Sequence, residues 1–295
     1  MAGSPAPHTL DLHCDTLLEI QGGARIAGAP EGHVDLPRLA SGRIRAQFFV
    51  AFVATAFPAE RAHAEANALL DLLYRTCDAH PETLRRVPAA AEGERAVDAG
   101  KIAAIAAVEN GHAIEGDLRK LEALARRGVR YMTLTHARHL PWAASSGEGG
   151  DGPGGLTAFG REVVAAMNRL GIIVDVSHVH ESTFWDVVRV CRRPFIASHS
   201  CAAAICPLAR NLSDDQIRAV GDAGGVVGIN FYPGFLDPRY FAVRGASVSA
   251  LFEQLEKIER AHLDDPARRT AEARRMAAAW RATAGPAEAD LETIC

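Results

Sequence analysis

The chain has 295 residues, of which 48% are hydrophobic and 23% are charged, and its formal net charge at pH 7 is −4. This composition is typical of a globular protein with a large apolar core. Basic residues are scattered, no basic flank precedes an apolar N-terminal segment, and no apolar stretch reaches the roughly 18 residues of a membrane span. We therefore expect no nucleic-acid partner, no secretion signal and no membrane association. The six cysteines lack a Cys-x-x-Cys spacing, which favours a reduced, cytoplasmic setting.

Short apolar runs recur along the chain and predict the strands of a parallel sheet. Runs such as "AQFFVAFV" and "IAAIAAV" are apolar at every position, which is typical of strands buried on both faces. The predicted strands cover residues 9–14, 44–53, 102–108, 130–135, 172–177, 194–198 and 225–230.

Helical patterns separate these strands. Ser213, before "DDQIRAV", has the position of a helix N-cap. Residues 231–247 are predicted as a loop that leads into a long polar helical stretch over 247–283. Between the strands, apolar residues recur at helical spacing in the segments 60–77, 117–127, 159–170 and 181–191.

Alternating strands and helices predict an α/β fold, and the architecture that fits is a TIM-type (β/α)8 barrel. We expect one domain over residues 1–295. A closed barrel needs eight strands, but only seven apolar runs are found and none follows 225–230. We therefore expect that the eighth strand is missing and that the chain is shortened at its C-terminus.

Residue types that bind metals stand at the ends of several apolar runs. Barrel active sites lie where the strands end and the following loops begin, so these side chains are expected to converge. A carboxylate that can bridge two ions, with imidazoles on either side, fits a two-metal hydrolase site. The candidate ligands are His13, Asp15, Glu109, His178 and His199.

Three of these candidates, His13, Asp15 and Glu109, also have a simpler interpretation. His13 and Asp15 are two residues apart on a strand, so both should project to one face, with Leu12 and Cys14 on the other. They could instead form a hydrogen-bonded surface pair. Glu109 could cap the turn that follows its strand rather than meet a cation. The joint placement of all five candidates favours metal binding.

Two further residues lie where a substrate would bind. His136 follows the run "RYMTLT" and could be a sixth ligand or a donor to the substrate. Arg210 lies eleven residues beyond His199, and a guanidinium at the barrel mouth could hold a carboxylate bidentately. The alternative for Arg210 is a solvated loop residue.

The sequence resembles the renal (membrane) dipeptidase family of zinc peptidases over most of residues 9–232. The matching strings are "LDLHCDTLLE", "VENGHAI", "GVRYMTLTHARHLPWA", "GLTAFGREVVAAMNRLGIIVDVSHV", "PFIASHS" and "ARNLSDDQIRAVGDAGGVVGINFY". The resemblance implies a (β/α)8 barrel with two Zn²⁺ ions. It implies these roles: His13 and Asp15 on one zinc, Glu109 bridging both, His178 and His199 on the other, His136 beside the scissile carbonyl, and Arg210 on the substrate's terminal carboxylate.

The expected function is hydrolysis of dipeptides through a metal-activated water, with His136 and Glu109 as catalytic residues. The expected partners are a small dipeptide and, as an alternative to a monomer, a second copy of the chain in a homodimer. Two differences from the family pattern stand out. Nothing matches its Gly-Ser-Asp-Phe-Asp-Gly-like strand, whose first Asp exchanges protons, and the lipid-anchor and secretion signals of mammalian relatives are not found.

Three rival functions remain open on the sequence alone. A barrel hydrolase of lactones, phosphoesters or cyclic amides would use similar metals, but would more often show a His-x-His motif and a bridging lysine. A metal-binding chain without turnover is the second rival. A structural or partner-binding barrel is the third, although no exposed apolar or charged stripe supports it.

Overall fold

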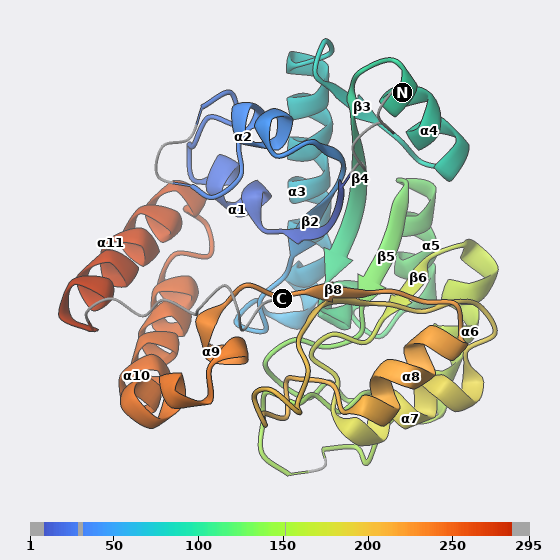
Figure 1. Cartoon of the computed structure of the whole chain (residues 1–295), viewed down its shortest axis with the longest axis vertical. Helices are drawn as coiled ribbons and strands as arrows, with labels where there is room; N and C mark the ends of the chain where they lie inside the picture. Colours follow the sequence, from blue (N-terminus) through green and yellow to red (C-terminus); the bar gives the residue numbers. More distant parts are fainter. Residues whose placement is uncertain (1–8, 29–31, 151, 285–295) are drawn as a thin grey trace, which may run out of the picture.

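The computed structural model describes residues 9–28, 32–150 and 152–284 (Figure 1). Residues 1–8 and the final Leu-Glu-Thr-Ile-Cys lie outside these ranges, so the predictions made on them are not addressed by the structure. Within the described ranges, no helix combines the length and the apolar character that crossing a bilayer requires.

A curled parallel sheet forms the centre of the molecule. Its strands are ordered β1-β2-β4-β5-β6, and the β7-β8 pair continues it through a bridge between Asp175 and Ile196. The architecture is therefore α/β, as a partial (β/α) barrel. All seven predicted strands are present, within a few residues of their expected bounds: β1 (Thr9–Cys14), β2 (Ile44–Phe52), β4 (Ile102–Glu109), β5 (Val129–Thr133), β6 (Ile173–Asp175), β7 (Ala197–Ser200) and β8 (Val227–Ile229).

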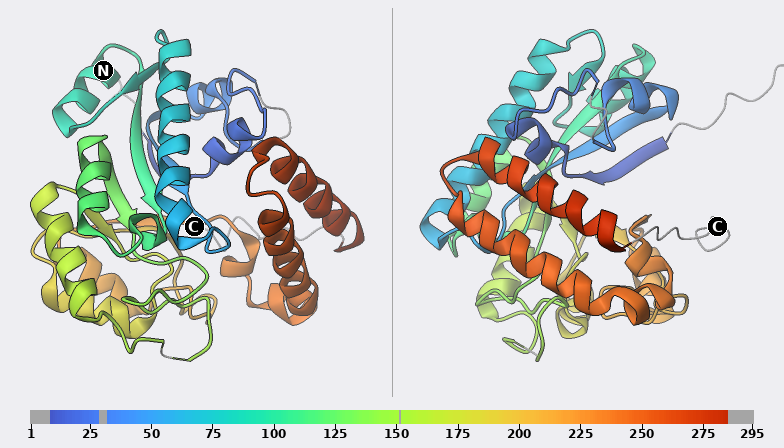
Figure 2. Two further views of the ribbon diagram at one scale, coloured as in Figure 1. Left: turned by 180° about the vertical axis from the view of Figure 1, so that it is seen from behind. Right: turned by 90° about the vertical axis from the view of Figure 1, so that its left-hand side faces the viewer.

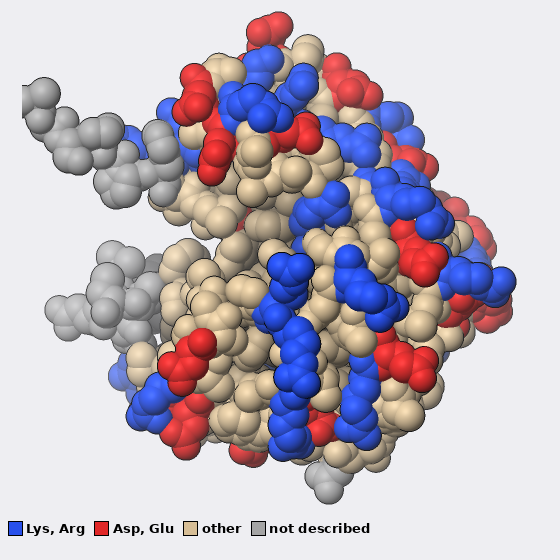
Figure 3. Space-filling model, turned by 90° about the vertical axis from the view of Figure 1, so that its right-hand side faces the viewer, with Lys and Arg blue, Asp and Glu red and all other residues tan. Residues whose placement is uncertain are grey.

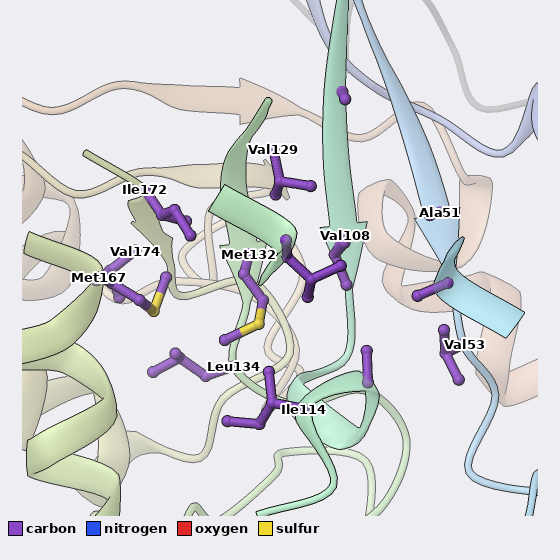
Figure 4. Close-up of a cluster of buried hydrophobic side chains, with 14 of the residues drawn as sticks. Ala51, Val53, Val108, Ile114, Val129, Met132, Leu134, Met167, Ile172 and Val174 are labelled. Atoms are coloured by element: carbon purple, nitrogen blue, oxygen red, sulfur yellow. The ribbon is translucent and has the colours of Figure 1, made fainter. Parts of the chain in front are cut away.

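The two faces of the sheet bury different side chains because neighbouring residues on a strand point in opposite directions. The concave face holds a compact cluster of Phe48, Val50, Ala107, Tyr131 and Ile196. The outer face packs under the helices in a much larger core. Its members include the side chains labelled in Figure 4, among them Val108, Val129, Met132, Val174 and Met167. Burying each large aliphatic side chain contributes about 1.5–3 kcal/mol, so this outer core stabilises most of the fold.

Helices follow the strands and cover the outer face (Figures 1 and 2). In α8 the predicted N-cap is confirmed, because Ser213 and Gln216 exchange hydrogen bonds in a capping box. In α6, Gly171 ends the helix with a φ of +70°. The helices are α1 (Thr16–Gln21), α2 (Leu36–Ser41), α3 (Ala59–Ala79), α4 (Ala90–Asp98), α5 (Leu118–Arg126), α6 (Ala158–Leu170), α7 (Glu181–Val190) and α8 (Asp214–Asp222), with a 3-10 turn, η1 (Gly111–Ile114).

The structure contains elements that the sequence patterns did not predict. A short strand, β3 (Leu84–Arg86), pairs with the start of β4 although it has no apolar run. The segment predicted as a loop over 231–247 contains α9 (Pro233–Leu236) and the start of α10 (Pro238–Ala261). Asp237 caps α10 by accepting from the backbone of Arg239, and Pro238 occupies its first turn, where proline needs no donor.

The predicted polar helical stretch is two helices, α10 and α11 (Pro266–Ala284), which run side by side (Figure 2). Arg269 of α11 joins them to the barrel, since its guanidinium bonds Gln21 of α1 and Glu65 of α3. On the opposite side of the molecule, Lys, Arg, Asp and Glu side chains are interspersed over one face (Figure 3).

Candidate metal centre

The predicted ligands come together at the C-terminal ends of the strands. Glu109 is the last residue of β4, His199 lies in β7, and His13 lies near the end of β1. His178 and His136 follow β6 and β5 by three residues each. In Figure 1 the arrowheads of β4 and β5 point to this same end of the barrel.

Glu109 occupies the centre of the cluster, and its side chain is 3% exposed. Its Oε2 lies 3.4 Å from Nε2 of His13. Its Oε1 lies 3.1 Å from Nε2 of His178 and 3.4 Å from Nε2 of His199. One carboxylate therefore faces three imidazoles that come from three different strand ends.

Within the cluster, Glu109 and His13 each stabilise the charged form of the other. Burial opposes ionisation of Glu109, but His13, His136 and His178 hold the pKa of this carboxyl well below its usual value. Burial likewise opposes a charge on His13, but Glu109 and Asp15 raise its pKa to about 10. Without a metal ion, a proton on His13 thus balances the buried carboxylate.

The arrangement fits a divalent cation. The Oε1 atom of Glu109 is buried and has no hydrogen-bond partner among the described residues, which is costly unless a cation meets it. Carboxylate and imidazole are also the ligands that Zn²⁺ prefers in hydrolases. Ligand atoms lie within 4.8 Å of one another in two groups that share Glu109: one with His13 and His199, the other with His136 and His178.

Asp15 is near the cluster but belongs to neither group. Its Oδ1 lies 3.6 Å from Nε2 of His13, and its side chain is 53% exposed. β1 ends at Cys14, and Asp15 is already the N-cap residue of α1. The strict alternation that we predicted therefore does not reach Asp15.

The end of β1 departs from alternation in a second way. Leu12 packs against the cluster on the concave face, whereas Cys14 packs into the outer core. The prediction that both turn away from the metal face was wrong for Leu12, because the pairing with β2 is irregular between Asp11 and Cys14. Such irregularities re-aim side chains, and this one leaves His13 facing Glu109.

His178 has an uncommon backbone conformation, with a φ of +69°. A non-glycine residue is seldom stable there unless its surroundings impose the conformation. The carbonyl oxygen of His178 accepts hydrogen bonds from the backbone of Ser146 at 2.8 Å and from the hydroxyls of Thr135 and Ser146, both at 3.1 Å. The loop after β5 therefore fixes the direction in which His178 points.

His136 lies against the same cluster. Its ring centroid is 4.4 Å from that of His178 and 4.6 Å from that of Phe52. Burial lowers the pKa of His136, so its imidazole is neutral at neutral pH. The position fits both roles considered from the sequence, a sixth ligand and a hydrogen-bond donor to a substrate.

Arg210 lies between β7 and α8, beside the cluster. Its Nη1 donates to Oγ of Ser200 at 2.8 Å, and its Nη2 donates to the carbonyl oxygen of His199 at 2.6 Å. Its Nε is buried without a hydrogen-bond partner in the described part of the chain. Burial lowers the pKa of Arg210 to about 10, so the side chain stays charged at neutral pH. A guanidinium whose buried Nε has no partner in that part of the chain suits an anionic ligand.

A buried polar network behind the ligands was missed by the sequence analysis. Tyr131 forms a 2.8 Å hydrogen bond with Nδ1 of His13, and Oγ of Ser198 forms one of 2.7 Å with Nδ1 of His199. Asp175, which is completely buried, accepts from Ser198. The available signal was a carboxylate inside the apolar run "IIVDV", where an ionisable group needs partners.

A sequence model of the membrane dipeptidase family (peptidase family M19) matches residues 6–262. The chain belongs to this family. A dipeptidase of Aspergillus oryzae, Dipeptidase aclJ, is 35% identical over 212 residues, which are 68% of this chain and 50% of the relative. The chain thus spans about half the length of the curated relatives that it matches, such as this one.

Two solved structures extend the comparison. Dipeptidase AC, a metallopeptidase of family M19, has a TM-score of 0.72 and 31% identity, covering 78% of this chain and 74% of that one. A metallopeptidase of Rhodobacter sphaeroides, bound to a phosphinate mimic of the dipeptide L-Ala-D-Ala, has a TM-score of 0.72 and 26% identity, covering 95% and 94%. The chain therefore belongs to a family that includes solved metallopeptidases, and the residue types around Glu109 are ones that could hold a metal ion.

Proposed function

We propose that this chain is a metal-dependent dipeptidase that uses two Zn²⁺ ions. The observation that carries the proposal is the buried Oε1 of Glu109, which has no hydrogen-bond partner in the described chain and faces two imidazole nitrogens. Glu109 would bridge the two ions, as expected from the sequence. The other ligands would be His13 and Asp15 on one side, and His178 and His199 on the other.

Asp15 must turn its exposed carboxylate toward His13 to complete this set, which its position at a helix N-cap allows without moving β1. Bound zinc would polarise the scissile carbonyl and lower the pKa of a water molecule. The chain's own residues would then hold the substrate. The unused Nε of Arg210 would bind the terminal carboxylate, and the neutral imidazole of His136 would donate to the carbonyl oxygen.

The test is metal content per chain together with hydrolysis of a panel of small dipeptides. The panel should include D-residues at the C-terminal position, because the Rhodobacter sphaeroides relative was solved with an L-Ala-D-Ala mimic. We expect two zinc ions per chain and hydrolysis that is lost after chelation and restored by zinc. Zinc binding without hydrolysis of any dipeptide would favour the rival function of a metal-binding chain without turnover.

The substitution His136→Gln separates the two roles that are open for this residue. If His136 donates to the substrate, the variant should retain both zinc ions and lose roughly 10²–10³-fold in kcat, as for other oxyanion donors. If His136 is a ligand, the zinc content should fall instead. His112 lies in η1, where its Nε2 bonds the carbonyl oxygen of Phe57, so His112→Gln is the matched control.

A further inference from the structure

Asp175 is a completely buried carboxylate whose acceptor positions are all used. Its Oδ1 accepts from the backbone N–H groups of Ser177 at 3.0 Å and Ser198 at 2.8 Å. Its Oδ2 accepts from the hydroxyls of Thr133 and Ser198, both at 2.6 Å. A carboxylate has about four acceptor sites, so Asp175 is saturated by donors from β5, β7 and the residue Ser177 that follows β6.

The hydroxyl of Ser198 connects this carboxylate to the metal cluster. A hydroxyl has one hydrogen, and here it is given to Oδ2 of Asp175, which can only accept. The 2.7 Å contact between Ser198 Oγ and Nδ1 of His199 must then have the imidazole as donor. His199 therefore carries its proton on Nδ1.

The other nitrogen of His199 faces the proposed metal centre. Its Nε2 lies 3.4 Å from Oε1 of Glu109 and 2.8 Å from Nε2 of His178. With the proton on Nδ1, this Nε2 presents a bare lone pair, which is the form that a metal ion requires.

We propose that Asp175 is a positioning residue that acts through Ser198 to select the tautomer of His199 that can bind a metal. Carboxylate partners of ligating histidines commonly fix tautomer and ring orientation, and here a serine hydroxyl stands between the two groups. The inference rests on the proposed function only in taking Nε2 as a ligand atom. The tautomer itself is a property of the metal-free chain.

The substitution Asp175→Asn makes a specific prediction. The backbone N–H groups of Ser177 and Ser198 can only donate hydrogen bonds, so they still need an acceptor in the variant. The amide oxygen must therefore take the Oδ1 position. The amide NH₂ then takes the Oδ2 position and donates to the hydroxyls that previously donated to it. The Ser198 hydroxyl turns to Nδ1 of His199, and the proton moves to Nε2.

The tautomer can be read directly by ¹⁵N NMR of metal-free, histidine-labelled protein at neutral pH, with the His199 signals assigned from a His199→Gln variant. We expect a protonated Nδ1 in the wild type and a protonated Nε2 in Asp175→Asn. Zinc affinity, measured by competition with a chromogenic chelator, should fall roughly 10–100-fold in the variant.

Two further variants test whether the effect passes through the hydrogen-bond relay from Asp175 through Ser198 to His199, or through packing around Asp175. Thr133→Val removes one donor from the same carboxylate oxygen but leaves the Ser198 relay, so His199 should keep its proton on Nδ1. Ser198→Ala removes the relay and should leave a mixture of tautomers, which provides a second reading if Asp175→Asn does not fold.

A wild-type proton on Nε2, or the same tautomer in wild type and Asp175→Asn, would overturn the proposal. The same change of His199 tautomer in Thr133→Val would overturn it too, because any disturbance around Asp175 would then be enough to move the proton. The wild type could bind no zinc while Asp175→Asn still moves the His199 proton from Nδ1 to Nε2. That result would refute the proposed function and support the positioning role of Asp175.

Discussion

The β1–β6 sheet and the β7–β8 pair contribute to one site but are held together very differently. β2 and β4 pair without interruption from Ala46 and Ala103 to Phe52 and Glu109. β7 and β8 share two register positions with an irregularity between them. The side chains around β8 are also poorly covered, since Ile229 is 50% exposed and Phe231 69% exposed.

This difference matters because the proposed chemistry needs residues from both regions. Glu109 comes from the long central ladder, whereas His199 and Arg210 come from the weakly paired region. Asp175 lies where the two meet, and its carboxylate bonds both the β5 hydroxyl of Thr133 and the β7 residue Ser198. The geometry of the site therefore depends on how well the weaker pair is docked.

The largest effect is expected in the central ladder, from Glu109→Gln. The amide removes the negative charge that both proposed ions share, so zinc binding and dipeptide hydrolysis should fall together, by roughly 10³-fold or more for the rate. Glu115→Gln is the matched control, because Glu115 is also largely buried but pairs with Lys120 away from the cluster. Zinc content and kcat/KM measure the outcome, and an active Glu109→Gln enzyme would refute the bridging role.

In the region of the β7–β8 pair, Arg210→Met should selectively slow the hydrolysis of substrates with a free C-terminal carboxylate. Losing one partner of a buried charged contact costs about 2–5 kcal/mol, which should appear in kcat/KM for dipeptides but not for their C-terminal amides. Arg210 also bonds Ser200 and the carbonyl of His199, so its loss could disturb the site itself. Such a disturbance would affect dipeptides and their amides equally, which makes the amides the control. Equal losses would show that Arg210 supports the fold instead.

The docking of β8 on β7 can be loosened by Gly228→Ala. A Cβ at this position would collide with the carbonyl oxygen of Ser198 and press on Leu12, so the strands must separate. We expect a loss of about 1–3 kcal/mol in the free energy of unfolding and weaker zinc binding. Gly221→Ala in α8 is the control, because nothing lies near its Cβ and alanine favours a helix. A stable Gly228→Ala variant with unchanged zinc affinity would show that this contact is unimportant.

The smallest effect is expected outside both regions, at Glu259 in α10. Burial, together with the neighbouring charges of Glu65 and Glu256, raises the pKa of Glu259 to about 7, although the charge of Arg269 acts in the opposite direction. The folded state thus binds this proton more tightly than the unfolded state, and its stability falls as pH rises from about 4.5 to 7.

Glu259→Gln should therefore raise the free energy of unfolding by about 1–2 kcal/mol at pH 8, after allowance for solvent screening, and leave it unchanged at pH 4. Urea titrations at the two pH values measure this. Glu253→Gln, at an exposed position of the same helix, should change neither value. A gain that is equal at both pH values would contradict the burial of this carboxyl.

Much of the fold could be predicted because buried parallel strands are apolar throughout and end on polar residues. That pattern identified β2, β4 and the positions of Glu109, His178 and His199. β3 could not be found, since it is short, polar and held by pairing with β4. The start of α10 was recognisable in principle from Asp237-Pro238, but the surrounding prolines, glycine and aromatics favoured a loop.

Within the site, the sequence could identify ligand types but not their orientation. The irregular pairing of β1, the left-handed φ of His178 and the relay from Asp175 all depend on contacts between distant segments. Periodicity alone placed Asp15 on one face with His13, but the strand ends before Asp15. Tertiary contacts therefore decide which of the predicted residues face one another.

The central claim is that Glu109 holds two metal ions between imidazoles from both regions. Anomalous diffraction at the zinc edge, from crystals of the zinc-loaded chain, tests it most directly. We expect two peaks about 3.5–4 Å apart that flank the Glu109 carboxylate, one near His13 and one near His178. Zinc peaks that lie away from Glu109, or no peak within ligand distance of its carboxylate, would contradict the account.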